Sequence, residues 1–272
     1  MKKILCLVLA AVMAVMAFTA CGDKGGKNEN TSAEAAGNTT AEVQQLDPSA
    51  KDEGVMTYAQ FIEAASGTDI IVEGFIQAKQ VYSETYGNTS LYLADGDGAY
   101  FAYRVACTAE EYAKFEIGAK VKVTGQKAVW SGEIEIGEGC KAEVVGTDKW
   151  TAGKLDVTSI ISNTEELAKN MNKAVTVKGL EIVASTVDGD ATEHAFLYKH
   201  NGTGSQGDDL YFKVKSGETV YTFVVESDLC GAETEAYKAV EALKVGDKID
   251  IEGFLYWYNA PQIQVTGVAA AK

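Results

Sequence analysis

Alternating hydrophobic and polar residues run through most of the chain beyond residue 56, and two stretches follow the same pattern. They read IGAKVKVTG at residues 117–125 and VGDKIDIEG at residues 245–253, which lie 128 residues apart. An alternation with a period of two is typical of a strand that buries one face. The pattern therefore predicts one long strand in each of two related units.

The segments around these two strands also correspond. IIVEG at 70–74 matches VTVKG at 175–179, and hairpin patterns follow at 91–105 and 210–225. A short helical stretch comes after each hairpin, and a capped helix is expected before each unit, opened by Thr57 with Gln60 and by Asn163 with Glu166. Each unit is thus predicted to run helix, long strand, hairpin, short helix, hairpin.

This order of five strands with a helix between the third and fourth resembles the OB-fold. The first unit resembles OB-fold domains in lipoproteins of anaerobic Gram-positive gut bacteria, through the segments MTYAQFIEAA, VEGFIQAKQ, DGDGAYFAYRVACTAEEYAKF and GAKVKVTGQKAVWSGEIEI. YNAPQIQV at 258–265 is similar to the last hairpin of OB modules attached to secreted nucleases. The resemblance implies a mainly β chain with two five-stranded Greek-key barrels, at residues 56–148 and 163–272, joined by a linker at 149–162.

The amino terminus has the order of a secretory signal. A basic start, Met1-Lys2-Lys3, precedes an uncharged apolar run at 4–18, and Phe18-Thr19-Ala20-Cys21 resembles a bacterial lipobox. The resemblance implies a signal peptide at 1–20, lipidation of Cys21 and anchoring at the extracytoplasmic face of the cell membrane. The alternative is an ordinary signal peptide with a chance cysteine.

Residues 21–55 contain no aromatic side chain and few bulky aliphatic ones. Such a segment cannot bury enough apolar surface to offset the entropy of ordering it. We expect it to be a flexible tether between the anchor and the barrels.

OB barrels bind ligands on the face of strands two and three, beside the loops after strands one and four. Aromatic rings that fall there could stack on sugars or bases. Strand alternation places about half of such rings inside a barrel, so core packing is the alternative for each one. The candidate ligand-binding residues are Tyr82, Tyr92, Tyr103, Trp130, Tyr211, Tyr256, Trp257 and Tyr258.

Net charge separates the classes of ligand. The chain carries a formal charge of −15, and Arg104 is the one arginine. Nucleic-acid binding depends on a basic surface, so this composition disfavours it even though the OB resemblance implies it. An extracellular oligosaccharide or a protein partner suits the acidic, aromatic units better. A structural role in a surface assembly is the third hypothesis.

Nothing in the sequence indicates an enzyme, a cofactor or a metal. The chain has two histidines and lacks a nucleophile elbow, a phosphate-binding glycine loop and a CxxC pair. Asp95-Gly96-Asp97-Gly98 is expected to be a tight hairpin turn, and Glu133 and Glu135 are expected on one solvated strand edge. Cys107 and Cys140 follow neighbouring strands of one barrel, so either a disulfide or two free thiols would fit there.

Overall fold

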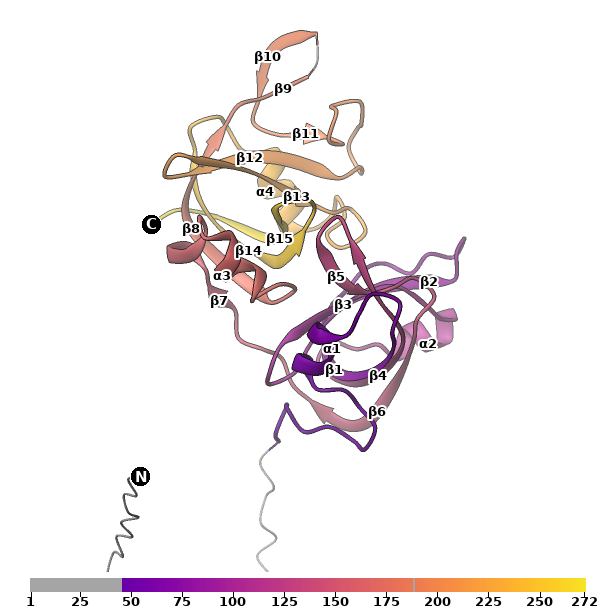
Figure 1. The fold of residues 1–272 in the computed structure, drawn as a ribbon. Coiled ribbons are helices and arrows are strands. Elements are labelled where there is room, and N and C mark those ends of the chain that lie inside the picture. Colours follow the sequence, from indigo (N-terminus) through magenta and orange to yellow (C-terminus); the bar gives the residue numbers. More distant parts are fainter. Residues whose placement is uncertain (1–45, 188) are drawn as a thin grey trace, which may run out of the picture. The chain divides into compact units, whose positions relative to one another are not determined.

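A computed structural model describes residues 46–187 and 189–272, which belong to one compact unit (Figure 1). The predicted signal peptide, Cys21 and the tether as far as residue 45 lie outside the described residues.

The first half forms one barrel, and its β1 pairs with both β2 and β4, which closes the sheet. The order around it is β1-β2-β3-β5-β4, with β3 and β5 parallel and an added strand, β6, beside β4. This is the strand order of an OB barrel. The elements are α1 (Tyr58–Glu63), β1 (Asp69–Lys79), β2 (Asn88–Ala94), β3 (Ala99–Ala106), α2 (Ala109–Lys114), β4 (Ala119–Trp130), β5 (Glu133–Ile136) and β6 (Lys141–Lys149).

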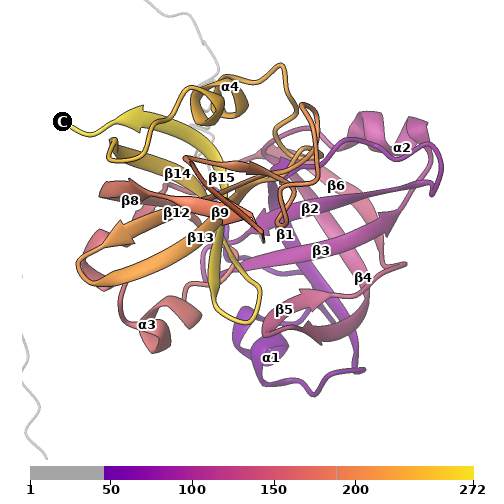
Figure 2. The ribbon, with the colours of Figure 1, turned by 90° about the horizontal axis from the view of Figure 1, so that it is seen from above.

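The second half repeats this topology in the order β8-β12-β13-β15-β14, and β8 pairs with both β12 and β14 (Figure 2). The predicted fold class of two five-stranded barrels is thus confirmed. The elements are β7 (Leu155–Asp156), η1 (Thr158–Ile160), α3 (Thr164–Ala168), β8 (Ala174–Val183), β9 (Ser185–Val187), β10 (Asp190–His194), β11 (Leu197–Tyr198), β12 (Leu210–Ser216), β13 (Thr219–Val225), α4 (Glu235–Glu241), β14 (Lys248–Trp257) and β15 (Pro261–Ala270).

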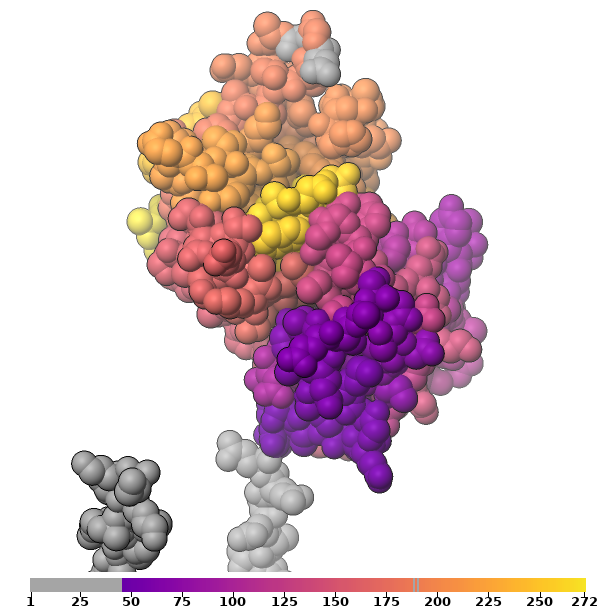
Figure 3. Space-filling model, viewed as in Figure 1, coloured from indigo at the N-terminus to yellow at the C-terminus, as the bar shows by residue number. Residues whose placement is uncertain are grey.

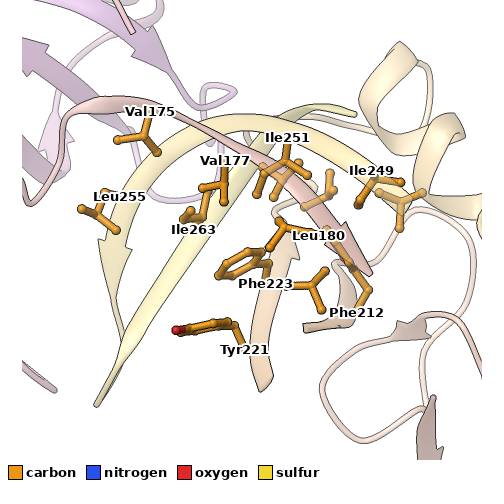
Figure 4. Packing of buried hydrophobic residues seen from close by; sticks show 14 of the residues in the cluster. Val175, Val177, Leu180, Phe212, Tyr221, Phe223, Ile249, Ile251, Leu255 and Ile263 are labelled. Carbon is orange, nitrogen blue, oxygen red and sulfur yellow. The ribbon is translucent and has the colours of Figure 1, made fainter. Parts of the chain in front are cut away.

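Each barrel is filled by the inward residues of its alternating strands. Side chains from β8, β12, β13, β14 and β15 interdigitate in the second barrel, among them Val177, Phe212 and Ile251 (Figure 4). The first barrel has its own core, with Val72, Leu93 and Val123 fully buried. The two repeated strand patterns therefore build two separate cores.

Local signals in the sequence also form as expected. The Thr57 hydroxyl accepts a hydrogen bond from the Gln60 amide, and Gln60 Oε1 accepts one from the Thr57 amide, which completes a capping box. Asp95 Oδ1 accepts hydrogen bonds from the amides of Asp97 and Gly98, which makes 95–98 the predicted tight turn.

Residues at both ends of the first domain pack on the barrels. Lys51, inside the predicted tether, donates from Nζ to Asp95 Oδ2 at 2.5 Å and to the Glu73 carbonyl at 2.7 Å. Val157 and Ile161, inside the predicted linker, are buried in the core of the second barrel. Short segments without strong periodicity thus contribute to the folded unit.

Candidate binding groove between the two barrels

The outer face of β2 and β3 packs against the second barrel. The Tyr92 ring stacks on the Phe254 ring, with centroids 4.2 Å apart and planes inclined by 13°. The Tyr92 hydroxyl donates to Gln264 Oε1 at 2.6 Å, and the Phe101 and Tyr256 rings meet edge to face. Part of the face expected to hold a ligand is therefore used to hold the second barrel, and Tyr92 has no free ring face.

The last hairpins of the two barrels also meet. The Asn259 amide in the β14–β15 turn donates to the Ser131 carbonyl in the β4–β5 turn at 2.6 Å. A Cβ on Gly132 would lie 2.6 Å from Trp257 Cδ1, so a larger residue could not occupy that turn without a shift. Figure 3 shows the yellow C-terminal segment directly beside the β4–β5 hairpin.

The two candidate tryptophans have different environments. Trp257 is 9% exposed and belongs to the core of the second barrel, whereas Trp130 is 53% exposed. The spacing of 128 residues that relates Gly125 to Gly253 relates Trp130 to Tyr258, not to Trp257. Successive side chains on a strand point to opposite faces. An offset of one residue therefore puts Trp130 and Trp257 on opposite faces of their corresponding strands. Trp130 and Tyr258 instead contact each other, with ring centroids 5.2 Å apart.

Beside this junction lies a groove of about 700 Å³. It follows the uncovered part of the β2–β3 face, the loop after β1 and the β4–β5 hairpin, which is the region where OB barrels bind ligands. The second barrel closes one side of it with Glu226, Asp228 and Tyr256. Of the sequence candidates, Tyr103, Trp130 and Tyr256 line this groove.

Carboxyl groups lie on both sides of the groove. Glu135 of β5 is 6% exposed, and burial raises its pKa to about 7. Burial, followed by the charges of Asp209 and Asp228, raises the pKa of Glu226 to about 7, and Glu226 Oε2 accepts a hydrogen bond from Gln80 Nε2 at 2.9 Å. A groove with two such groups changes its charge near neutral pH.

The same carboxylates raise the pKa values of two tyrosines that line the groove. Burial raises the pKa of Tyr103 and of Tyr256, and negative charge at Glu135 and Glu226 raises both further. Neither hydroxyl forms a hydrogen bond with another described residue. These hydroxyls are therefore free to bind a polar ligand.

Arg104 lies at the rim and is the one cation among the described residues that line the groove. Its guanidinium forms an ion pair with Glu138 at 3.1 Å and lies 5.0 Å from the Tyr103 ring centroid. Its backbone has φ of +48°, an uncommon conformation for a residue other than glycine. Glu135, Glu138, Glu226 and Asp228 outnumber this single positive charge.

The expectation of a solvated edge at Glu133 and Glu135 is wrong. Both side chains share the outward face of β5, as the alternation predicts, but Glu133 is fully buried because the second barrel covers it. Glu133 Oε2 accepts a hydrogen bond from the Trp257 amide at 2.8 Å, and burial raises the pKa of Glu133 to about 8.

The remaining candidates lie outside the groove lining. Tyr82 packs on Tyr112, with ring centroids 5.6 Å apart, and Tyr211 lies near His200. Cys107, Cys140 and Cys230 are all free thiols. Within residues 46–187 and 189–272, no cluster of three or more histidine, cysteine or acidic side chains could hold a metal.

Sequence reasoning missed Gln80, Glu135 and Glu226 as groove residues. The one signal for Glu135 was its place beside Glu133 on the fifth strand. Glu226 comes from the other barrel, and nothing local in its sequence connects it to the first. No helix in the part of the chain described here is long and apolar enough to span a membrane.

Comparison with known proteins gives distant structural similarity only. No family model and no curated protein matches the chain. Among solved structures, the Ifi202 HINa domain in complex with 20-bp dsDNA has 12% identity and a TM-score of 0.31, covering 75% of this chain and 100% of that one. A replication protein A heterotrimer bound to ssDNA has 9% identity and a TM-score of 0.24, covering 80% and 69%. Similarity at this level assigns neither a family nor a ligand to this chain.

Proposed function

We propose that this chain is a non-enzymatic binding protein, anchored by lipidated Cys21 at the extracytoplasmic face of the membrane, that binds an oligosaccharide in the groove between its barrels. The anchor is supported by the order of basic, apolar and FTAC segments in residues 1–21. The ligand is supported by the composition of the groove lining, which combines aromatic rings with carboxyl groups.

The observation that carries the proposal is the pairing of exposed rings with hydrogen-bonding groups at one site. Trp130 and Tyr258 present partly exposed rings at the junction, and Tyr103 and Glu135 line the groove beside them. A sugar ring packs its apolar face on aromatic side chains and directs its hydroxyl groups to carboxylate and phenol oxygens. A groove of about 700 Å³ is large enough for more than one such ring.

Single-stranded nucleic acid is the second candidate. It is favoured by Arg104, which lies on the β3 face beside the rings of Tyr103 and Tyr86, since bases stack on such platforms. It is opposed by the four carboxyl groups that line the same groove, because phosphates need a surplus of positive charge.

One titration separates these candidates. The protein comprising residues 46–272 is titrated with a panel of soluble oligosaccharides and with a single-stranded DNA oligomer, each at 50 mM and 300 mM salt. Oligosaccharide binding that is insensitive to salt supports the proposal. DNA binding that weakens steeply with salt, without any oligosaccharide binding, overturns it in favour of the second candidate.

A further inference from the structure

Glu135 is a buried acidic side chain that has no partner among the residues that the structure describes. It is 6% exposed, it lines the groove, and it forms no hydrogen bond or ion pair with any described residue. Buried polar groups in proteins are nearly always hydrogen-bonded, and a buried charge is costly unless it is paired. An unpaired carboxyl at a groove wall is therefore a group that a ligand can satisfy.

The described groups that line the groove around Glu135 can accept hydrogen bonds, but none of them pairs a positive charge with it. Glu226 lies on the wall formed by the second barrel, and the charges of both carboxylates act on the Tyr103 and Tyr256 hydroxyls. Arg104, the one cation among the described lining residues, is already paired with Glu138 at the rim. The inner part of the groove thus combines negative charge with aromatic walls.

We propose that this part of the groove recognises a primary ammonium group at Glu135, beside the Tyr103 and Tyr256 rings and with Glu226 on the wall formed by the second barrel. An ammonium provides three hydrogen-bond donors and the missing positive charge, and it is attracted to the faces of aromatic rings. This inference rests on the proposed binding function and specifies its ligand. The group could belong to an amino sugar within an oligosaccharide or to a free polyamine.

The proton balance of the site agrees with this assignment. Burial keeps the pKa of Glu135 and of Glu226 near 7, so the empty groove retains protons at neutral pH. An ammonium stabilises the ionised carboxylates and lowers both pKa values. Binding of a ligand that is already charged should therefore release protons, and its affinity should rise between pH 5.5 and pH 8.

Calorimetric titration of residues 46–272 at pH 7.0 with three probes tests the proposal. The probes are a tetramer of glucosamine, its fully N-acetylated counterpart and spermidine. Binding of the glucosamine tetramer at least tenfold tighter than the N-acetylated one is the expected result. Equal or tighter binding of the N-acetylated tetramer overturns the ammonium assignment and leaves the oligosaccharide function standing.

The titration with spermidine shows whether the ammonium group belongs to an amino sugar or to a free polyamine. Binding of spermidine without either sugar supports the ammonium site and overturns the oligosaccharide function. Binding of no probe overturns both. The Glu135→Gln variant should lose roughly tenfold or more in affinity for the amine that binds, and Glu218→Gln, an exposed change in the β12–β13 turn, should lose nothing. Unchanged affinity of a folded Glu135→Gln protein contradicts the proposal.

Discussion

The Glu133 carboxyl in the first barrel accepts a hydrogen bond from the backbone amide of Trp257 in the second, with Oε2 and N 2.8 Å apart. Glu133 is fully buried, and neither its Oε1 nor the buried Oδ1 of the neighbouring Asn172 accepts a hydrogen bond from the part of the chain that the structure describes. The Asn172 side chain and the Trp257 amide lower the pKa of Glu133, but burial raises it more. Burial at the interface therefore favours the neutral form of Glu133 over the ionised form.

This arrangement predicts that acidification stabilises the fold. Burial raises the pKa of Glu133 to about 8 and the pKa values of Glu135 and Glu226 to about 7. In the unfolded chain a glutamate has a pKa of about 4.3. The folded protein therefore binds more protons than the unfolded chain between about pH 4.5 and 8, and its free energy of unfolding falls as pH rises through that window.

Thermal melts between pH 5.5 and pH 8.5 measure this effect. The melting temperature should fall from pH 5.5 to about pH 8 and level off above it. Glu133→Gln, which stays neutral, should make the fall shallower throughout and remove most of it above pH 7. Glu133→Ala should cost about 1–3 kcal/mol at pH 6, because it leaves the Trp257 amide without its acceptor. A melting temperature that rises with pH would refute this account of the interface.

The turn at Gly132 should tolerate no side chain. Gly132 has φ of +92°, and an added Cβ would lie 2.6 Å from Trp257 Cδ1. Gly132→Ala should destabilise the protein by about 1–3 kcal/mol through backbone strain and the clash together. Gly139→Ala is the matched control, since φ is +82° there and no atom lies within 4 Å. Urea denaturation measures the free energy of unfolding of both variants. Equal decreases in that free energy would show that the clash with Trp257 adds nothing to the cost of Gly132→Ala.

The two tryptophans should respond in opposite ways to truncation. Trp257→Ala removes a large core side chain and should cost about 3–5 kcal/mol of stability. Trp130→Ala removes a half-exposed ring at the groove, so it should leave the melting temperature nearly unchanged and weaken oligosaccharide binding several-fold. A melt run beside a binding titration gives both quantities. Loss of stability in Trp130→Ala as large as in Trp257→Ala would remove Trp130 from the binding surface.

Lys51 should be required for the stability of the first barrel. Its ammonium pairs with Asp95, whose side chain is fully buried, so Lys51→Ala leaves an uncompensated charge inside the protein. Such a change costs about 3–5 kcal/mol. Lys114→Ala, which breaks an exposed pair with Glu110, is the control and should melt near the parental temperature. A Lys51→Ala protein as stable as this control would place residues 46–55 outside the folded unit after all.

The strands and both barrels could be predicted because their signals are local. Alternation along 117–125 and 245–253 fixes which residues face each core, and the turn at 95–98 needs only its own aspartate and glycines. What could not be predicted is which outward face becomes covered. Tyr92 and Glu133 both point outward as expected, and both are buried because the second barrel docks on them.

The candidate site, too, could be predicted where its residues follow a local pattern and could not where it depends on the packing of the two barrels. Rings at the barrel rim were identifiable from the OB-like pattern, and Tyr103, Trp130 and Tyr256 do line the groove. Glu226 joins them only through the packing of two units that lie far apart in sequence. The separation of Trp130 from Trp257 follows from an offset of one residue, which a comparison based on residue type alone overlooks.

Amide hydrogen exchange with and without the tightest-binding oligosaccharide tests most directly whether the groove between the barrels is the ligand site. The loop after β1 and the β4–β5 hairpin, residues 80–90 and 128–138, should exchange more slowly when the ligand is bound, and Glu135→Gln should reduce that protection at the same ligand concentration. Protection confined to β6 or to the far side of the second barrel, with none at 80–90 and 128–138, would contradict the assignment of the groove.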